Sequence, residues 1–127
     1  MDKKILKHGS ALCICYLVER DRHPELHHFL VEVKKNDLSA YKKTFNTIER
    51  LKDYPEQLKT LQDFKKLQTN ENIWELKVTS HIRLFLFYSA ENEVCITHGY
   101  RKQRKNDKRL QKEIEKAIRI KQRYYDE

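Results

Sequence analysis

Two cations, Lys77 and Arg83, lie on consecutive strand patterns, and their spacing offers the clearest chemistry in the chain. Successive side chains of a strand point to opposite faces of a sheet. A three-residue turn between the two strands would place Lys77 directly opposite Arg83. Like charges so placed are unfavourable by about 0.2–1 kcal/mol. Folding gives no reason for such a pair, whereas anion binding does. The alternative is that Glu75 neutralises the pair.

Aromatic residues continue the face on which Arg83 lies. Phe85 and Phe87 follow it at strand spacing. Exposed aromatic rings beside cations are typical of surfaces that stack nucleic-acid bases while neutralising phosphates. The alternative is that both rings are buried beneath a helix.

The third strand pattern, residues 93–100, leads directly into a basic cluster. It also carries His98, which lies on the same face of the sheet as Arg83 in one register and points to the core after a slip of one residue. A histidine beside a basic groove can transfer protons, and a core histidine is the alternative. The cluster consists of Arg101, Lys102, Arg104 and Lys105.

Charge and composition bound the class of partner. The net charge is +8 with a pI near 9.4, and most of the excess follows His98. A basic field of this kind attracts nucleic acid, an acidic protein or an anionic membrane, although a merely solvated basic helix would carry the same charge. No run approaches the roughly 18 apolar residues of a membrane span. The apolar run 11–18 is a poor signal peptide, so we expect a cytoplasmic protein.

Three cysteines, Cys13, Cys15 and Cys95, are an odd number for a disulfide framework. We expect reduced, buried thiols. The C-x-C pair has no second pair of ligands at zinc-binding spacing. The sequence therefore predicts no metal and no cofactor.

Hydrophobic periodicity indicates the elements that position these residues. An apolar run at 11–19 reads as a buried strand, and Pro24 starts an amphipathic helix. A second helix follows Asp37, a predicted N-cap. After three antiparallel strands comes a C-terminal helix that Asn106 or Asp107 could cap. We predict one α+β domain, residues 1–127, with a small, mostly antiparallel sheet, an N-terminal helical hairpin on one face and a C-terminal helix. Residues 1–10 could be disordered.

Four segments in order, IWELKV, IRLFLFY, ITHGYRK and KEIEKA, resemble the RelE/HigB superfamily of bacterial toxins. The resemblance is greatest to the HigB-like, phage-related branch, whose elements read approximately Y-E-L-R, Y-R-V-x-Y, L-x-H-G-F-x-K-K and K-E-I-E-x-A. Three features depart from that branch. No proline precedes K-E-I-E, and Thr79-Ser80-His81 replaces a turn that often contains glycine. Leu86 and Phe87 replace a simpler pattern around the following tyrosine.

The resemblance implies a toxin of a type II toxin–antitoxin pair. Many such toxins are ribosome-dependent endoribonucleases, or mRNA interferases. In their metal-independent reaction, a ribose 2′-hydroxyl attacks the neighbouring phosphate of mRNA while basic residues stabilise the developing charge. The implied partners are the ribosome, mRNA and a cognate antitoxin, expected to be a helix-turn-helix protein. ParE-type relatives instead poison DNA gyrase without cutting RNA, so a non-catalytic toxin or a nucleic-acid-binding adaptor is the alternative.

The resemblance also implies residue roles. Arg83 would contact the scissile phosphate, Lys77 matches a second basic position, and Arg101 and Lys102 would bind phosphate or stabilise the leaving oxygen. The general base stays open between His98, Tyr124 and Tyr125, and the two tyrosines could also contact RNA. The residues expected to dock on ribosomal RNA are Lys65, Lys66, Arg104 and Lys105.

Overall fold

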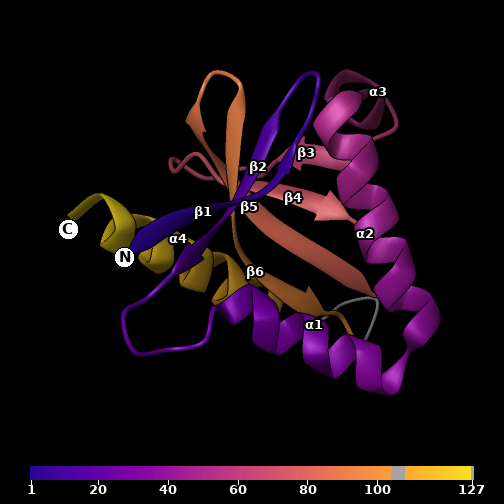
Figure 1. Cartoon of the computed structure of the whole chain (residues 1–127), viewed down its shortest axis with the longest axis horizontal. Coiled ribbons are helices and arrows are strands. Elements are labelled where there is room, and N and C mark those ends of the chain that lie inside the picture. Colours follow the sequence, from indigo (N-terminus) through magenta and orange to yellow (C-terminus); the bar gives the residue numbers. More distant parts are fainter. Residues whose placement is uncertain (104–107, 127) are drawn as a thin grey trace.

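A computed structural model describes residues 1–103 and 108–126 of the chain. It is an α+β fold in which helices cover both faces of a six-stranded sheet (Figure 1). The strands are β1 (Asp2–His8), β2 (Cys13–Val18), β3 (Phe64–Lys66), β4 (Trp74–Lys77), β5 (Ile82–Ala90) and β6 (Glu93–Arg101). The helices are α1 (Glu25–Asn36), α2 (Leu38–Asp53), α3 (Pro55–Thr60) and α4 (Leu110–Asp126).

The strand order is β1-β2-β6-β5-β4-β3, and every neighbouring pair is antiparallel except β2 and β6. The two long strands β5 and β6 therefore occupy the centre of the sheet. The parallel β2–β6 pair joins the N-terminal hairpin to this centre. Elements from distant parts of the sequence thus share one sheet.

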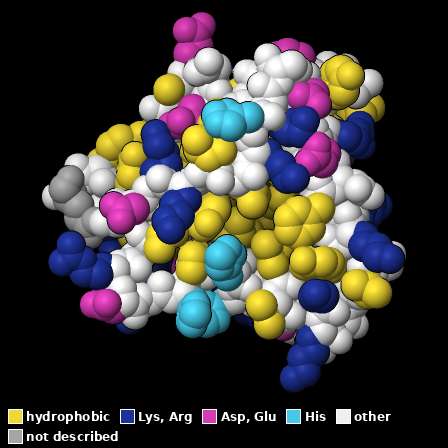
Figure 2. Space-filling model, viewed as in Figure 1, with side chains coloured by type: hydrophobic (Ala, Val, Ile, Leu, Met, Phe, Trp, Pro, Cys, Tyr) yellow, Lys and Arg dark blue, Asp and Glu magenta, His cyan; other side chains and the backbone are white. Residues whose placement is uncertain are grey.

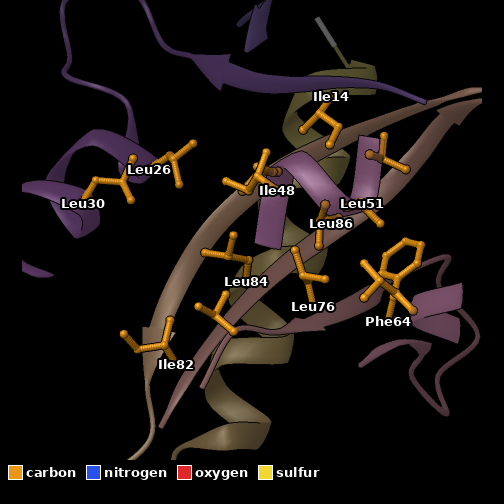
Figure 3. Packing of buried hydrophobic residues seen from close by; sticks show 14 of the residues in the cluster. Ile14, Leu26, Leu30, Ile48, Leu51, Phe64, Leu76, Ile82, Leu84 and Leu86 are labelled. Carbon is orange, nitrogen blue, oxygen red and sulfur yellow. The ribbon is translucent and has the colours of Figure 1, made fainter. Parts of the chain in front are cut away.

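One face of the sheet packs against α1, α2 and α3. Alternate strand residues turn towards these helices, including Leu76, Ile82, Leu84 and Leu86 (Figure 3). The predicted N-cap is confirmed, since the Asp37 side chain accepts a hydrogen bond from the backbone N–H of Ala40, 3.0 Å away. This face holds the larger of the two apolar clusters.

The opposite face of the sheet is covered by α4. Phe85 and Phe87 of β5 and Cys95 of β6 pack beneath Ala117 and Ile120 of the helix. Both Phe side chains are fully buried. The prediction that these rings are exposed for base stacking is therefore wrong, and the alternative, burial beneath a helix, is confirmed.

The predicted N-terminal helical hairpin does not match the structure. The chain begins with two strands, β1 and β2, and only then enters α1. A single residue, Asp37, joins α1 to α2, and the two helices run in different directions (Figure 1). Residues 1–10, whose order the sequence left open, include β1. The polar segment 57–72 contains part of α3 and β3.

An apolar groove lies between α1 and α2. Its lining includes His27, Leu30, Val31, Tyr41 and Phe45. Figure 2 shows this side of the molecule, where hydrophobic side chains gather between basic ones. Among the described helices, none is both long enough and apolar enough to cross a membrane.

Gly99 of β6 is fixed by the close approach of α1. A Cβ atom added at this position would lie 2.3 Å from Cδ2 of Phe29. Only a residue without a side chain therefore lets the helix lie this close to the sheet. This is the physical reason for the glycine of the ITHGYRK segment.

We predict that Gly99→Ala lowers the free energy of unfolding by about 1–3 kcal/mol, because the added methyl group overpacks the contact with Phe29. Urea unfolding followed by circular dichroism measures the change. In a Phe29→Leu background the same substitution should cost clearly less. An equal loss in both backgrounds would contradict this account of the glycine.

Candidate anion-binding site

A row of three residues crosses the α4 face of the sheet near the N-terminal end of that helix. Lys77 of β4 pairs directly with Arg83 of β5, and Arg83 pairs with Tyr100 of β6. The register predicted for Lys77 and Arg83 is therefore confirmed. Local alternation and the short turn bring Lys77 and Arg83 to one face, and the pairing of β5 with β6 adds Tyr100.

Arg83 is held in place by three contacts. Its Nε lies 3.3 Å from Oε1 of Glu75, and its Nη1 donates hydrogen bonds to the carbonyl oxygens of Thr79 and Ile82. The side chain is only 13% exposed. The neutralisation by Glu75 that the sequence offered as an alternative is thus present for Arg83. A guanidinium so fixed is preorganised to bind a carboxylate or phosphate group.

Lys77 differs from Arg83 in being exposed. Within the described part of the chain, its ammonium group forms no ion pair. Lys65 of β3 is also exposed and pairs with Glu75 of β4, so it lies on the same face. The arrangement combines one guanidinium held by three contacts with the ammonium groups of two exposed lysines. Such a set can neutralise a phosphodiester backbone.

Two residues that sequence reasoning did not single out complete the neighbourhood. Tyr100 is buried beside Arg83, and the guanidinium of Arg109 lies over its ring, with Cζ 5.4 Å from the ring centroid. Arg109 also donates a hydrogen bond to the backbone oxygen of Arg101. In the sequence, Arg109 is only one of the many basic residues that follow His98, so nothing marked it as a neighbour of Arg83.

His98 faces the same side of the sheet as Arg83 but is buried under α4, with 1% exposure. Its ring stacks on Phe85, and its Nε2 lies 2.8 Å from Oε2 of Glu113. Burial lowers the pKa of His98, although Glu113 opposes the shift. The hydrogen bond to His98 in turn lowers the pKa of the Glu113 carboxyl. A neutral imidazole that donates to a carboxylate satisfies both groups.

Arg101 is not brought to the row. It pairs with Ile82, so strand alternation directs its side chain to the opposite face from Arg83. The backbone N–H of Lys102 donates to the carbonyl oxygen of His81 just beyond the strand end. Arg101 therefore does not share a face with Lys77 and Arg83. Arg104 and Lys105 lie outside the described residues, as do the caps predicted at Asn106 and Asp107.

The remaining predicted residues are dispersed. Lys66 pairs with Trp74 and lies on the opposite face from Lys65. Tyr124 and Tyr125 pack against Phe87 at the C-terminal end of α4. Phe87 is four residues from Arg83, or about 13 Å along the strand. Burial also raises the pKa of Tyr125, which disfavours its phenolate as a base.

Comparison with known proteins identifies the family. Residues 31–122, well over half of the chain, match the profile of the family described as phage-derived protein Gp49-like (DUF891). Among solved structures, the YoeB dimer from Staphylococcus aureus superposes with a TM-score of 0.50 at 16% sequence identity. The match covers 72% of this chain and 97% of that chain. No curated protein matches the sequence significantly.

These findings define the class of protein as a RelE-type toxin of a toxin–antitoxin system. The chain belongs to the Gp49-like family of phage-derived proteins, the HigB-like part of that superfamily. The resemblance drawn from the sequence segments is therefore confirmed. The structural match at this identity supports the fold, whereas the family match supports the class.

We predict that acidification destabilises the protein in part through His98. Because burial lowers the pKa of His98 below its ordinary value of 6.5, the unfolded chain binds more protons than the folded chain at slightly acidic pH. The free energy of unfolding should then fall as the pH falls below 6.5. Glu113, whose pKa is also lowered, adds a further loss below its ordinary value of 4.5.

The measurement is urea unfolding at pH 7.5 and pH 5.5 for the wild type and His98→Gln. Glutamine can still donate to Glu113 but does not titrate. The variant should lose less stability between the two pH values than the wild type does. Equal losses would show that His98 does not titrate differently in the folded and unfolded chains.

Proposed function

We propose that this protein arrests translation by cleaving mRNA on the ribosome, without a metal ion. The observation that carries the proposal is the Lys77–Arg83 pair, two like charges placed directly opposite one another on one face of the sheet. Glu75 compensates Arg83 but leaves the Lys77 ammonium without an ion-pair partner in the described structure. A bound phosphate would satisfy this remaining charge.

The roles follow from the contacts of each residue. Arg83 contacts the scissile phosphate, because Glu75 and two backbone oxygens occupy its Nε and Nη1 but not its Nη2 among the described residues. Lys77 neutralises the same or the adjacent phosphate. As the ribose 2′-oxygen bonds to phosphorus, the bond from phosphorus to the 5′-oxygen breaks, and these two cations stabilise the negative charge that grows on the phosphoryl oxygens. The proton of the 2′-hydroxyl passes to water, and the departing 5′-oxygen takes a proton from water. Lys65 extends the basic surface towards the edge of the sheet.

None of the three residues predicted as general bases, His98, Tyr124 and Tyr125, lies where it could accept a proton from the 2′-hydroxyl at Arg83. His98 is buried and bonded to Glu113, and the tyrosines lie at the far end of α4. In RNA cleavage by this protein, positioning and charge stabilisation therefore contribute more than general-base catalysis does. A protein general base would have to come from the ribosome, or from His98 after α4 moves away from it.

The partners of this activity are mRNA, the ribosome and an antitoxin. Ribosomal action places the protein in the cytoplasm. The antitoxin blocks the toxin most directly by covering the Lys77–Arg83 row, and an acidic segment would complement this surface. Arg101, at the end of β6 and directed to the face opposite Arg83, and Lys102, just beyond that strand, are suited to ribosomal RNA or to the antitoxin rather than to the scissile phosphate.

A non-catalytic toxin that acts on DNA gyrase, or a nucleic-acid adaptor, is the second candidate. The Arg83–Glu75 ion pair and the burial of His98 favour it, because they leave the row without an exposed proton acceptor among the described residues. The two candidates differ in their product. Cleavage creates new mRNA 5′ ends within codons, whereas gyrase poisoning creates DNA breaks and leaves mRNA intact.

We predict that Arg83→Ala reduces translation arrest by at least about 100-fold, the scale expected when one preorganised charge contact is lost from a transition state. Induction of the wild type should produce new mRNA 5′ ends in polysomal RNA, mapped by sequencing, and the variant should not. Lys42→Ala, which removes an exposed cation of α2, is the matched control and should leave arrest unchanged. Full arrest by a soluble, folded Arg83→Ala protein would refute the assignment.

We also predict that Lys77→Ala weakens binding of single-stranded RNA and lowers the salt dependence of that binding. Loss of one phosphate contact should reduce the slope of log K against log salt concentration by about 0.7. Fluorescence anisotropy over a range of KCl concentrations measures the slope. Lys42→Ala should keep the wild-type slope, and an unchanged slope for Lys77→Ala would exclude its contact with phosphate.

A further inference from the structure

Three possible metal ligands converge at the other end of the α4 face. The Sγ atoms of Cys13 and Cys15 and a carboxylate oxygen of Glu93 all lie within 4.8 Å of one another. The two sulfur atoms are 3.9 Å apart. This cluster shares no residue with the Lys77–Arg83 row.

The three ligands come together through strand pairing, so the cluster could not be recognised from the sequence alone. Cys13 and Cys15 lie on one face of β2, and the parallel β2–β6 register places Cys13 opposite Glu93. Glu93 is 80 residues away in the chain from Cys13, so a search for ligands close together in the sequence does not find it. The prediction of no metal was based on the lack of a second pair of ligands nearby in the sequence. The pairing of β2 with β6 instead supplies a third ligand, Glu93, from a distant part of the chain.

The geometry suits a tetrahedral zinc ion. Zn–S bonds of about 2.3 Å at a tetrahedral angle hold two sulfur atoms about 3.8 Å apart, close to the distance between the Cys13 and Cys15 sulfurs. A carboxylate oxygen can complete three protein ligands. Cys15 is fully buried, whereas Cys13 and Glu93 are partly exposed, so an ion could enter from their side.

Charge selects a divalent ion. Two thiolates and one carboxylate carry three negative charges, and the Lys3 ammonium lies 2.5 Å from Oε1 of Glu93. A divalent cation together with Lys3 balances this charge, whereas a monovalent cation would leave a buried negative charge, which is costly.

Outer contacts fix the carboxylate. Ser89 Oγ donates to Oε1 of Glu93 over 2.6 Å, and Lys3 binds the same oxygen. Contacts of this kind orient the ligands of established metal sites. Cys95, which pairs with Cys15 across the two strands, is buried next to the cluster.

We propose that Cys13, Cys15 and Glu93 bind a zinc ion that ties the N-terminal β-hairpin to β6. The fourth position is open to water. The site lies beside Phe87, which pairs with Cys95, about 13 Å along β5 from Arg83. The ion would therefore stabilise the sheet without entering the anion-binding row, whatever reaction that row performs.

The test is titration of the full-length protein, kept reduced by a phosphine, with Co²⁺ as a spectroscopic substitute for Zn²⁺. One equivalent of Co²⁺ should give thiolate-to-cobalt charge-transfer absorption in the near ultraviolet, and Zn²⁺ should abolish it by displacement. Absence of this absorption from the folded wild-type protein would overturn the proposal without any variant.

Variants then assign the ligands. Cys13→Ser should weaken Zn²⁺ binding in a chelator competition by at least about 100-fold, and Glu93→Gln by about 10-fold or more. Glu91→Gln changes an exposed carboxylate in the same turn and should bind Zn²⁺ as the wild type does. Circular dichroism checks that each variant is folded. Wild-type affinity in folded Cys13→Ser would refute the site.

Discussion

Burial of both faces of the central strands is the constraint on which the rest of this structure depends. β5 turns Leu84 and Leu86 to α1 and α2, and it turns Phe85 and Phe87 to α4. Each buried side chain of this size stabilises the fold by about 1.5–3 kcal/mol relative to exposure. The chain must therefore place a helix on each face of β5.

The position of α4 decides where polar chemistry can occur. The helix covers the middle of β5 and β6 and buries His98 beneath Glu113. The Lys77–Arg83 row remains at the N-terminal end of the helix, where the sheet face is not filled by apolar side chains. The two cations and the smaller apolar cluster thus share one face of the sheet. α4 buries the apolar cluster, and its N-terminal end marks where the cations begin.

Electrostatic compensation distinguishes the two cations of the row. Glu75, which lies between Lys65 and the buried Phe85 in the register, forms an ion pair with Arg83 and helps to fix its guanidinium. Lys77 has no ion-pair partner among the described residues. The opposite end of the same face gathers two thiols and Glu93 beside Lys3. One sheet therefore presents a row of cations and a cluster of potential metal ligands at separate ends.

The sequence alone determined what depends on local pattern. Alternation in β4 and β5 with a short turn placed Lys77 opposite Arg83, and the order of motifs indicated the toxin class. Only the tertiary structure decided what depends on register and on which helix covers which face. It buried Phe85 and His98, directed Arg101 away from Arg83, and brought Glu93 to Cys13. Local periodicity specifies the side of a strand, but distant pairing specifies the neighbours that meet there.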